Sequence, residues 1–544
     1  MNDKTKTGLE ILEAALLLGI LGDALLRETP WGLNVFLWIG ALVAAMLMLT
    51  RRRRSEFLNK HTVALHFALV FFAAMFVWRD SMELKMLNTL AVLIILSLLT
   101  LPALKIKTQI AGVIHYFYAA IWSGLSAMFA PFYLLFGDIK WKTIPQAGWT
   151  KHLIAVLRGL AIAAPILLVF GALFVAADAV FQGIIEQTLH IDPAIIFTHI
   201  FLISFISWTV AGYLRGSLFE TLAVEKSANV KVQTSSITGK QEDGKKSTEA
   251  VSPEQTNGWN LQNFDNSSMP KSLTLGAIEV SIVLGLINLL FLGFVIVQIP
   301  YLFGGMELVQ ATPDFKLADY ARRGFGELVT VAALVLPILL LSHWLLRKDA
   351  PINEKIYRVL AGIQIGLLFV IMISATQRLL LLTGNLGYGL TTIRLYPMVF
   401  MVWLALVFVW FALTVLRGAR EQFAWGALWS AFFIVGTLHV FNPDDFIVRT
   451  NVRLMQEGRA FDSKYVADLS DDAVPTLLEN LPTMNFEQQC TIKWKLARRF
   501  ELAETENDFR TWNWARFAAH AEMSHNGESL DTTNCLERTF YDDF

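Results

Sequence analysis

Residues 31–54 read WGLNVFLWIGALVAAMLMLTRRRR, a mostly apolar run followed at once by four arginines. A helix needs about 20 mostly apolar residues to cross the hydrocarbon core of a bilayer, so this run predicts a transmembrane helix. Lys and Arg in short loops beside a span are retained in the cytoplasm. The arginine tetrad at 51–54 therefore predicts that this span ends on the cytoplasmic side.

The composition of the whole chain agrees with membrane insertion. Of its 544 residues, 55% are apolar and 17% are charged, and the mean hydropathy is +0.49. Ordinary soluble domains have about 45–50% apolar and about 25% charged residues. The 45 Lys and Arg nearly balance the 46 Asp and Glu, which argues against a nucleic-acid partner. We predict an integral membrane protein surrounded by lipid.

Similar apolar runs recur along the chain and predict about eleven transmembrane helices. With the tetrad inside, the later loops predicted to face the cytoplasm are also basic, and the amino terminus is cytoplasmic. An odd number of crossings places the part after residue 441 outside. The expected spans are residues 8–26, 31–50, 62–78, 86–104, 159–179, 194–213, 274–297, 326–346, 357–376, 397–416 and 422–441.

The apolar segment from Gln109 to Phe136 does not fit this alternation, because basic residues flank it on both sides. If it crossed once, every later loop would change sides and the basic loops would face outward. We therefore interpret it as a re-entrant or interfacial segment, and its Tyr and Trp residues suit the headgroup region. A compensating error, such as a first run that does not cross, is the alternative.

The predicted fold is an all-α polytopic transmembrane helix bundle with a small helical extracytoplasmic domain at its carboxyl end. The polar stretch at 225–272 is too poor in large apolar groups to form a core and is expected to be a disordered cytoplasmic linker. The expected regions are an amino-terminal four-span region at 1–107, a re-entrant or interfacial segment plus two spans at 108–224, the linker at 225–272, a five-span region at 273–441 and the helical tail at 442–544.

The tail combines helical periodicity with both cysteines of the chain. Apolar residues at 474, 477, 478 and 481 have helical spacing, and Ser470 is the expected helix cap. Cys490 and Cys535 are what an exported domain with one disulfide would contain, although two unrelated buried thiols would look the same in sequence.

Ionisable groups at the predicted outer membrane level are the main functional candidates. Asp178 and Glu327 lie there together with several arginines, which offer planar bidentate donors to an anionic ligand or a partner carboxylate. The alternative is that these arginines pair with Asp178 and Glu327 and only fix helix ends. Motifs of zinc hydrolases, ATPases and serine hydrolases are absent from the sequence, so we predict no catalytic residues, metal or cofactor and favour a non-enzymatic role.

Several short motifs in a fixed order over residues 159–480 resemble an uncharacterised bacterial membrane family, DUF4173, together with its relative DUF4153. The motifs are Ala177-Asp178-Ala179-Val180-Phe181, Tyr301-Leu302-Phe303-Gly304-Gly305, Tyr320-Ala321-Arg322-Arg323-Gly324-Phe325 before Glu327, Tyr388-Gly389-Leu390-Thr391 with Arg394, Asn442-Pro443-Asp444 with Asn451, and Leu469-Ser470 with Asp472-Ala473-Val474-Pro475. The resemblance implies a bacterial cytoplasmic (inner) membrane protein but no assigned activity.

In the predicted topology most of these motif residues gather at the outer face. The candidate ligand-binding residues are Asp178, Tyr320, Arg322, Arg323, Glu327, Arg378, Arg394, Asn442 and Asp444. The leading hypothesis is an envelope scaffold, sensor or accessory protein that binds an envelope protein or a small ligand at this face. A secondary transporter of a small solute is the second hypothesis, and a membrane-embedded transferase is the third.

Overall fold

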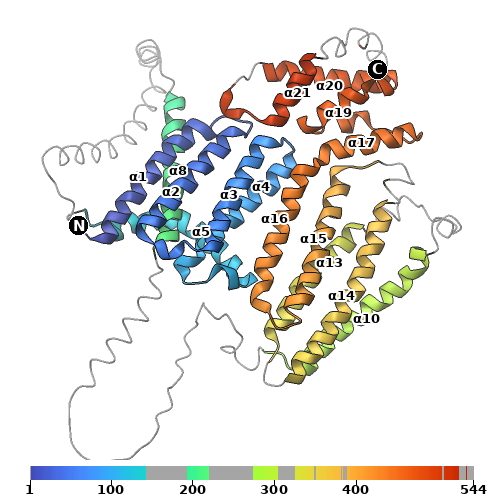
Figure 1. The fold of residues 1–544 in the computed structure, drawn as a ribbon, viewed down its shortest axis with the longest axis horizontal. Helices are drawn as coiled ribbons and strands as arrows, with labels where there is room; N and C mark the ends of the chain where they lie inside the picture. Colours follow the sequence, from blue (N-terminus) through green and yellow to red (C-terminus); the bar gives the residue numbers. More distant parts are fainter. Residues whose placement is uncertain are drawn as a thin grey trace, which may run out of the picture.

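The chain forms a helix bundle with a helical domain on one end (Figure 1). This computed structural model describes residues 2–141, 193–219, 274–303, 325–347, 351–380, 383, 389–504, 508–525 and 535. Within these ranges the structure has α-helices, short 3-10 or π turns and one isolated bridge between Leu275 and Leu346, but no β-strand. The predicted all-α membrane bundle is confirmed. The fifth expected span at 159–179 and the linker at 225–272 lie outside the described residues.

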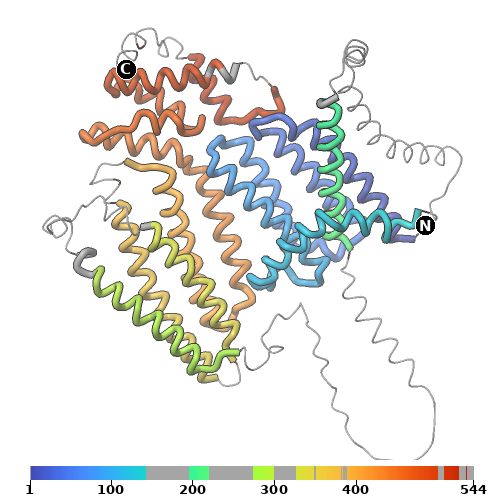
Figure 2. The backbone as a smooth tube through the Cα atoms, turned by 180° about the vertical axis from the view of Figure 1, so that it is seen from behind, coloured from blue at the N-terminus to red at the C-terminus, as the bar shows by residue number. Residues whose placement is uncertain are grey.

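Two groups of helices make up the bundle, and α16 joins them. The first group is α1 (Asp3–Leu26), α2 (Leu33–Arg53), α3 (Lys60–Trp78), α4 (Met82–Leu98), α5 (Val113–Tyr133) and α8 (Pro193–Leu218). The second group is α10 (Ala277–Phe303), α13 (Phe325–Leu345), α14 (Pro351–Leu380) and α15 (Thr392–Thr414), followed by α16 (Phe423–Phe441). Figures 1 and 2 show α16 between the two groups.

Each helix group has its own apolar core, and α16 contributes to both. Leu428 and Phe432 pack into the core of the first group, where Phe432 meets the ring of Phe72 at 5.1 Å between centroids. Phe423, one helical turn before Leu428, belongs to the core of the second group. The two groups are therefore held together through one shared helix.

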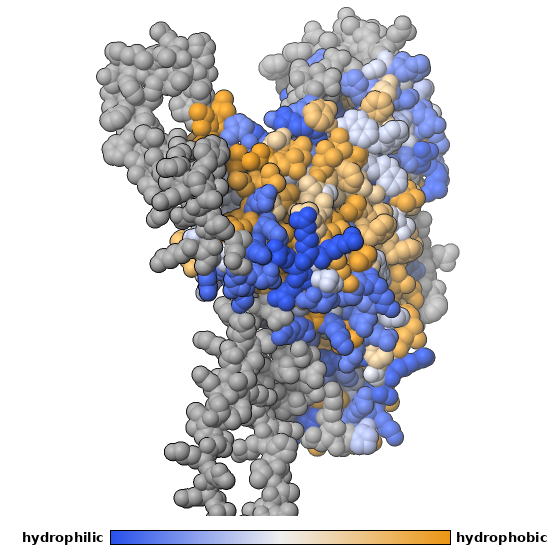
Figure 3. Space-filling model, turned by 60° about the vertical axis from the view of Figure 1, so that its left-hand side comes forward, coloured by the Kyte–Doolittle hydropathy of each residue, from blue (hydrophilic) through white to orange (hydrophobic). Residues whose placement is uncertain are grey.

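Ten helices of the described chain are long and apolar enough to cross a membrane. Helix α1 is not among them, although residues 8–26 were expected to span, because Glu10, Glu13 and Asp23 interrupt its apolar run. The ten candidates include residues 113–138, which overlap the segment expected to be interfacial. The space-filling view in Figure 3 shows apolar side chains in a broad patch, with hydrophilic side chains on either side of it.

The C-terminal domain consists of α17 (Pro443–Gln456), α18 (Ser463–Ala467), α19 (Val474–Asn480), α20 (Phe486–Glu504) and α21 (Trp514–His525). Its core contains the predicted apolar residues of α19, and Val474 and Leu477 are at most 1% exposed. The core also includes Leu390 and Leu395, which precede and begin α15. We call the end of the bundle that carries this domain the capped end and the opposite end the open end.

Backbone groups at the capped end of the helices are satisfied by side-chain and backbone groups of the C-terminal domain. The Asn513 amide donates to the carbonyl oxygens of Phe76 and Arg79, at the end of α3. The Leu33 N–H, at the start of α2, donates to the Trp512 carbonyl at 2.9 Å. Helix ends leave their last carbonyls and first N–H groups without helical partners, so these contacts fix the domain on the bundle.

A buried ion pair lies at the centre of this junction. The Asp472 carboxylate, 1% exposed, accepts from Arg79 Nη1 at 3.0 Å and from the N–H groups of Asp80 and Ser81 just before α4. Arg79 Nε also donates to the carbonyl of His439 near the end of α16, at 2.7 Å. The pair thus connects α3, α4, α16 and the domain.

Both ends of α5 lie at the open end. Just before its start, the 3-10 turn Thr108–Ile110 contacts the 3-10 turn Arg420–Gln422 that precedes α16, while beyond its end Asp138 contacts Arg215 in the last turns of α8 and Thr5 in the first turn of α1. Figure 2 shows α5 crossing its neighbours instead of running parallel to them. The crossing is close because Gly216 of α8 has no side chain, and a Cβ there would lie 2.6 Å from Ser126 Cβ.

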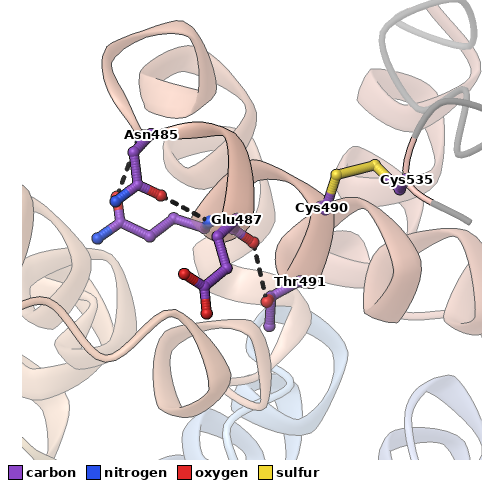
Figure 4. The surroundings of a disulfide bond; sticks show 6 residues. Asn485, Glu487, Cys490, Thr491 and Cys535 are labelled. Carbon is purple, nitrogen blue, oxygen red and sulfur yellow. Dashed lines mark hydrogen bonds between the residues drawn. A yellow bond between two sulfur atoms is a disulfide. The ribbon is translucent and has the colours of Figure 1, made fainter. Parts of the chain in front are cut away.

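A disulfide closes the C-terminal domain (Figure 4). Cys490 on α20 is bonded to Cys535, with their Cα atoms 5.5 Å apart and a sequence separation of 45. Asn485 caps the start of α20, because its side chain accepts from the N–H of Gln488 at 2.9 Å. The cross-link therefore ties the segment after α21 to a well-capped helix.

Replacing Asp472 by Ala is expected to lower the free energy of unfolding by about 3–5 kcal/mol, because Arg79 would remain buried without its counter-charge. Urea unfolding of the detergent-solubilised protein measures the change. The control is Glu354→Ala, which removes an ion pair to Arg358 whose side chains are 42% and 40% exposed. An exposed pair of this kind contributes at most about 1 kcal/mol, so equal losses in the two variants would contradict the central role of Asp472.

Candidate functional site

A pocket of about 540 Å³ lies between the capped end and the C-terminal domain. The bundle contributes residues from the loop before α2, from the start of α4 and from the start of α15, and the domain contributes residues from α17 to α21. Five carboxylates and three basic side chains line it, together with polar and apolar groups: Asp80, Glu83, Asp444, Asp468, Asp471, Lys85, Arg499, Arg516, Pro30, Met82, Thr392, Tyr465, Leu469 and Ser470. Its size lies within the range of small-molecule sites, about 300–1,000 Å³.

Three of the five carboxylates are paired with basic side chains. Asp80 contacts Lys85 Nζ at 2.6 Å and Arg516 Nε at 3.5 Å. Asp471 contacts Arg499 Nη1 at 3.1 Å, and Asp468 contacts Lys495 Nζ at 2.5 Å. Across the described chain, Glu83 and Asp444 have no such ion pair. Glu83 Oε2 accepts only a hydrogen bond from Ser81 Oγ, at 3.2 Å.

Asp444 is buried, and only one of its two carboxylate oxygens has a hydrogen-bond partner among the described residues. Its residue is 2% exposed, and Oδ2 accepts from Ser470 Oγ at 2.5 Å, whereas Oδ1 has no hydrogen-bond partner among the described residues. Burial raises the pKa of Asp444 to about 6, the hydrogen bond from Ser470 opposes this shift, and the charges of Glu83 and Asp472 add to it. This carboxyl group therefore changes its charge near neutral pH.

Other titratable groups of the pocket are also affected by burial. Burial raises the pKa of Asp471, the neighbouring Asp80 adds to the rise, and Arg499 opposes it. Burial lowers the pKa of the Arg516 guanidinium. The Tyr465 hydroxyl accepts from the N–H of Thr392 at 2.8 Å and so links the domain to the first turn of α15.

The structure brings two of the predicted site residues to this junction. Asp444 lines the pocket, and Asn442, at φ +53°, precedes α17 and donates from its amide to the carbonyl of Asp472 at 3.3 Å. The prediction that the Ser470 side chain caps a helix was wrong. Its side chain makes no cap hydrogen bond and instead donates to Asp444. A hydroxyl beside a buried carboxylate forms the stronger, charge-assisted bond.

The remaining predicted residues do not line the pocket in the described chain. Arg394 donates to the carbonyl of Gly389. Arg378 is buried on α14 and donates to Gln298 Oε1 of α10 at 2.5 Å. Glu327 lies exposed in the first turn of α13. Asp178, Tyr320, Arg322 and Arg323 lie outside the described residues.

Sequence reasoning missed Glu83, Lys85, Tyr465, Arg499 and Arg516. The available signal was the stretch Arg79-Asp80-Ser81-Met82-Glu83-Leu84-Lys85, which puts charged residues into the short connection between two spans. Charged side chains at such a connection are unremarkable in themselves, because any loop exposed to water tolerates them. In the part of the chain that the structure describes, no group of three or more His, Cys, Asp or Glu could hold a metal ion.

Three of the motifs behind the family resemblance, those around Gly389, Asn442 and Ser470, meet at the same junction in the described chain. Asn451 on α17 accepts from the Leu390 N–H at 2.6 Å and donates to the Leu390 carbonyl at 2.8 Å. Asp444 meets Ser470 in the same way. The family described as domain of unknown function (DUF4153) matches residues 66–480.

The chain belongs to the DUF4153 family. The resemblance expected from the sequence is thereby confirmed for this relative of DUF4173. The match runs from α3 to the end of α19, so it includes Glu83, Asp444 and Asp472 but not Arg499 or Arg516. The searches of curated proteins and of solved structures found no match. This DUF4153 protein is a multi-pass membrane protein.

Gly389→Ala is expected to destabilise the junction by about 1–3 kcal/mol. Gly389 has φ +69°, and a Cβ there would lie 2.7 Å from Asn451 Oδ1. Thermal unfolding of the purified protein measures the loss. The control Gly458→Ala has φ +80° but nothing within 4 Å, so it should lose only the conformational part, about 1 kcal/mol. Equal losses at both positions would show that the Asn451 contact is unimportant.

Asp444→Asn is expected to change the pH dependence of stability. The Asp444 pKa is about 6 in the folded protein, against an ordinary value of 3.8, so folding favours the protonated carboxyl group. Its contribution to native stability is full below about pH 4 and is lost as the pH rises towards 6. Asn cannot ionise and still offers an oxygen to Ser470.

The variant should therefore gain stability relative to the parent as the pH rises through this range. Thermal unfolding at several pH values between 4 and 8 measures the difference, and the comparison cancels the titration of the groups that both proteins share. A difference that does not change with pH would contradict the buried, protonatable state of Asp444.

Proposed function

We propose that this DUF4153 protein is a non-enzymatic bacterial envelope protein that binds a small ligand at its capped end, which faces the extracytoplasmic side. The observation that carries the proposal is the pocket between bundle and domain, with one buried carboxylate oxygen left without a donor. Buried polar atoms nearly always have a hydrogen-bond partner, so an orphan at a pocket wall indicates a ligand position.

The orientation is supported by the charges of the open end. The tetrad at 51–54 ends α2 there, and Lys105, Arg417 and Arg420 follow spans that also end there. Basic residues of this kind face the cytoplasm. The disulfide of the domain at the other end is what an oxidising, extracytoplasmic compartment permits.

In this topology α5 lies in the cytoplasmic interface of the inner membrane. The turn just before its start contacts the turn that precedes α16, and Asp138 just beyond its end contacts Arg215 of α8, both at the open end. Exposed apolar side chains recur at helical spacing along it, at Phe117, Ile121, Leu125, Met128 and Phe132. Such a stripe suits the boundary between headgroups and acyl chains, and the orientation of the later spans is preserved.

A cysteine at Thr392 tests whether the pocket opens to the outside. The two native cysteines are bonded to each other, so Thr392→Cys introduces one free thiol at the pocket wall. We expect a membrane-impermeant maleimide to label this variant in intact cells, because the pocket faces the extracytoplasmic side.

The matched control is Glu56→Cys, an exposed position in the 3-10 turn after α2 at the open end. It should be labelled only after the membrane is permeabilised. The reverse pattern, with Glu56→Cys labelled in intact cells and Thr392→Cys protected, would overturn the proposed orientation and with it the outer binding site.

A further inference from the structure

We propose that the pocket at the capped end binds a small organic cation through an ammonium group held between Glu83 and Asp444. This inference rests on the proposed function, because it names the class of ligand for the same site. Glu83 comes from the first turn of α4 and Asp444 from the first turn of α17, so the ammonium group would bridge the bundle and the domain.

The charge balance of the pocket wall favours a cation. Asp80, Asp471 and Asp468 are neutralised by basic side chains. Glu83 and Asp444 lack a cation partner among the described residues, and the charge of Glu83 adds to the rise in the pKa of Asp444. A positively charged group between them would remove this repulsion.

The unpartnered oxygen of Asp444 adds an independent observation. The residue is 2% exposed, it lines the pocket, and Oδ1 has no donor in the described chain while Oδ2 accepts from Ser470. An ammonium group carries three donors and no acceptor, which suits two carboxylates. The Tyr465 hydroxyl also lines this wall and offers a further polar contact.

The shape of the site favours an organic ion over a bare metal ion. Ca²⁺ takes 6–8 oxygen ligands and Mg²⁺ requires near-octahedral geometry, whereas only two unpaired carboxylates face this pocket, and no group of three acidic, His or Cys residues in the described ranges could hold a metal. The volume of about 540 Å³ also leaves room for a carbon skeleton behind the ammonium group. Met82 and Leu469 supply apolar surface for such a skeleton.

Protection of the Thr392→Cys thiol tests the inference on the purified full-length protein in detergent. The probe is putrescine, a small diamine, and the readout is the rate of maleimide labelling. We expect the rate to fall about tenfold at a probe concentration about ten times its Kd, because labelling requires an empty pocket. Glu83→Gln and Asp444→Asn, each in the Thr392→Cys background, should abolish the protection.

Two controls separate binding from loss of structure. Glu479→Gln changes an exposed carboxylate on α19 outside the pocket and should keep full protection. The labelling rate without probe should be the same in all variants if they remain folded. If Asp444→Asn fails this check, Glu83→Gln alone decides the role of the paired carboxylates.

The other outcomes overturn the inference in different ways. Protection by glutarate but not by putrescine would show that the pocket takes an anion, and protection by calcium chloride alone would show a metal site. In both cases the proposed binding function would stand and the ligand class would be wrong. A reactive thiol that none of these probes protects would also reject the cation. Failure of the proposed function itself would appear earlier, as a Thr392→Cys thiol that is inaccessible from outside intact cells.

Discussion

The backbone groups at the capped ends of the helices must find partners, and the Asp472 carboxylate is the group that most of the junction depends on. It accepts from Arg79 and from the N–H groups just before α4, while Arg79 also donates to a carbonyl near the end of α16. The Asn513 amide donates to the Phe76 carbonyl oxygen at the end of α3. Because helix ends cannot satisfy these groups themselves, a domain that supplies the missing donors and acceptors is held in one orientation.

Asp472 and Asp444 show how two carboxylates of one junction differ in role. Asp472 is buried with a cation and several N–H donors, so its charge is compensated in place. Asp444 is as deeply buried but receives only Ser470, and it lies beside Glu83. The first arrangement is stable by itself, whereas the second leaves negative charge and an unused acceptor at a pocket wall. The two carboxylates therefore differ in the hydrogen-bond and ion-pair partners that they have, and not in how deeply they are buried.

Packing within the membrane part depends on different interactions. The two helix groups have separate cores and meet through α16, where His439 Nε2 and Asn88 Oδ1 of α4 form a hydrogen bond at 2.9 Å. Close crossings such as that of α5 over α8 use glycine because lipid provides no hydrophobic force between helices. The shared helix and the C-terminal domain both connect the two helix groups. Because the pocket lies between the bundle and the domain, a movement of one relative to the other would change the shape of the pocket.

The sequence by itself determined the helical membrane class, the positions of most spans, the helical nature of the tail and the family, whereas the pairing of Cys490 with Cys535 came from the structure. The features that the sequence determined depend on the length of apolar runs, on periodicity and on motif order, all of which are local. It also placed Asp444 and Asn442 among the candidate residues, because their motif belongs to a specific order of motifs. Only the tertiary structure decided that Asp444 lies beside Glu83, more than three hundred residues earlier in the chain, and that Ser470 bonds to Asp444 instead of capping a helix. A carboxylate stays unpaired or finds a basic partner depending on which side chains the fold brings together from distant helices. A local sequence pattern does not contain this information.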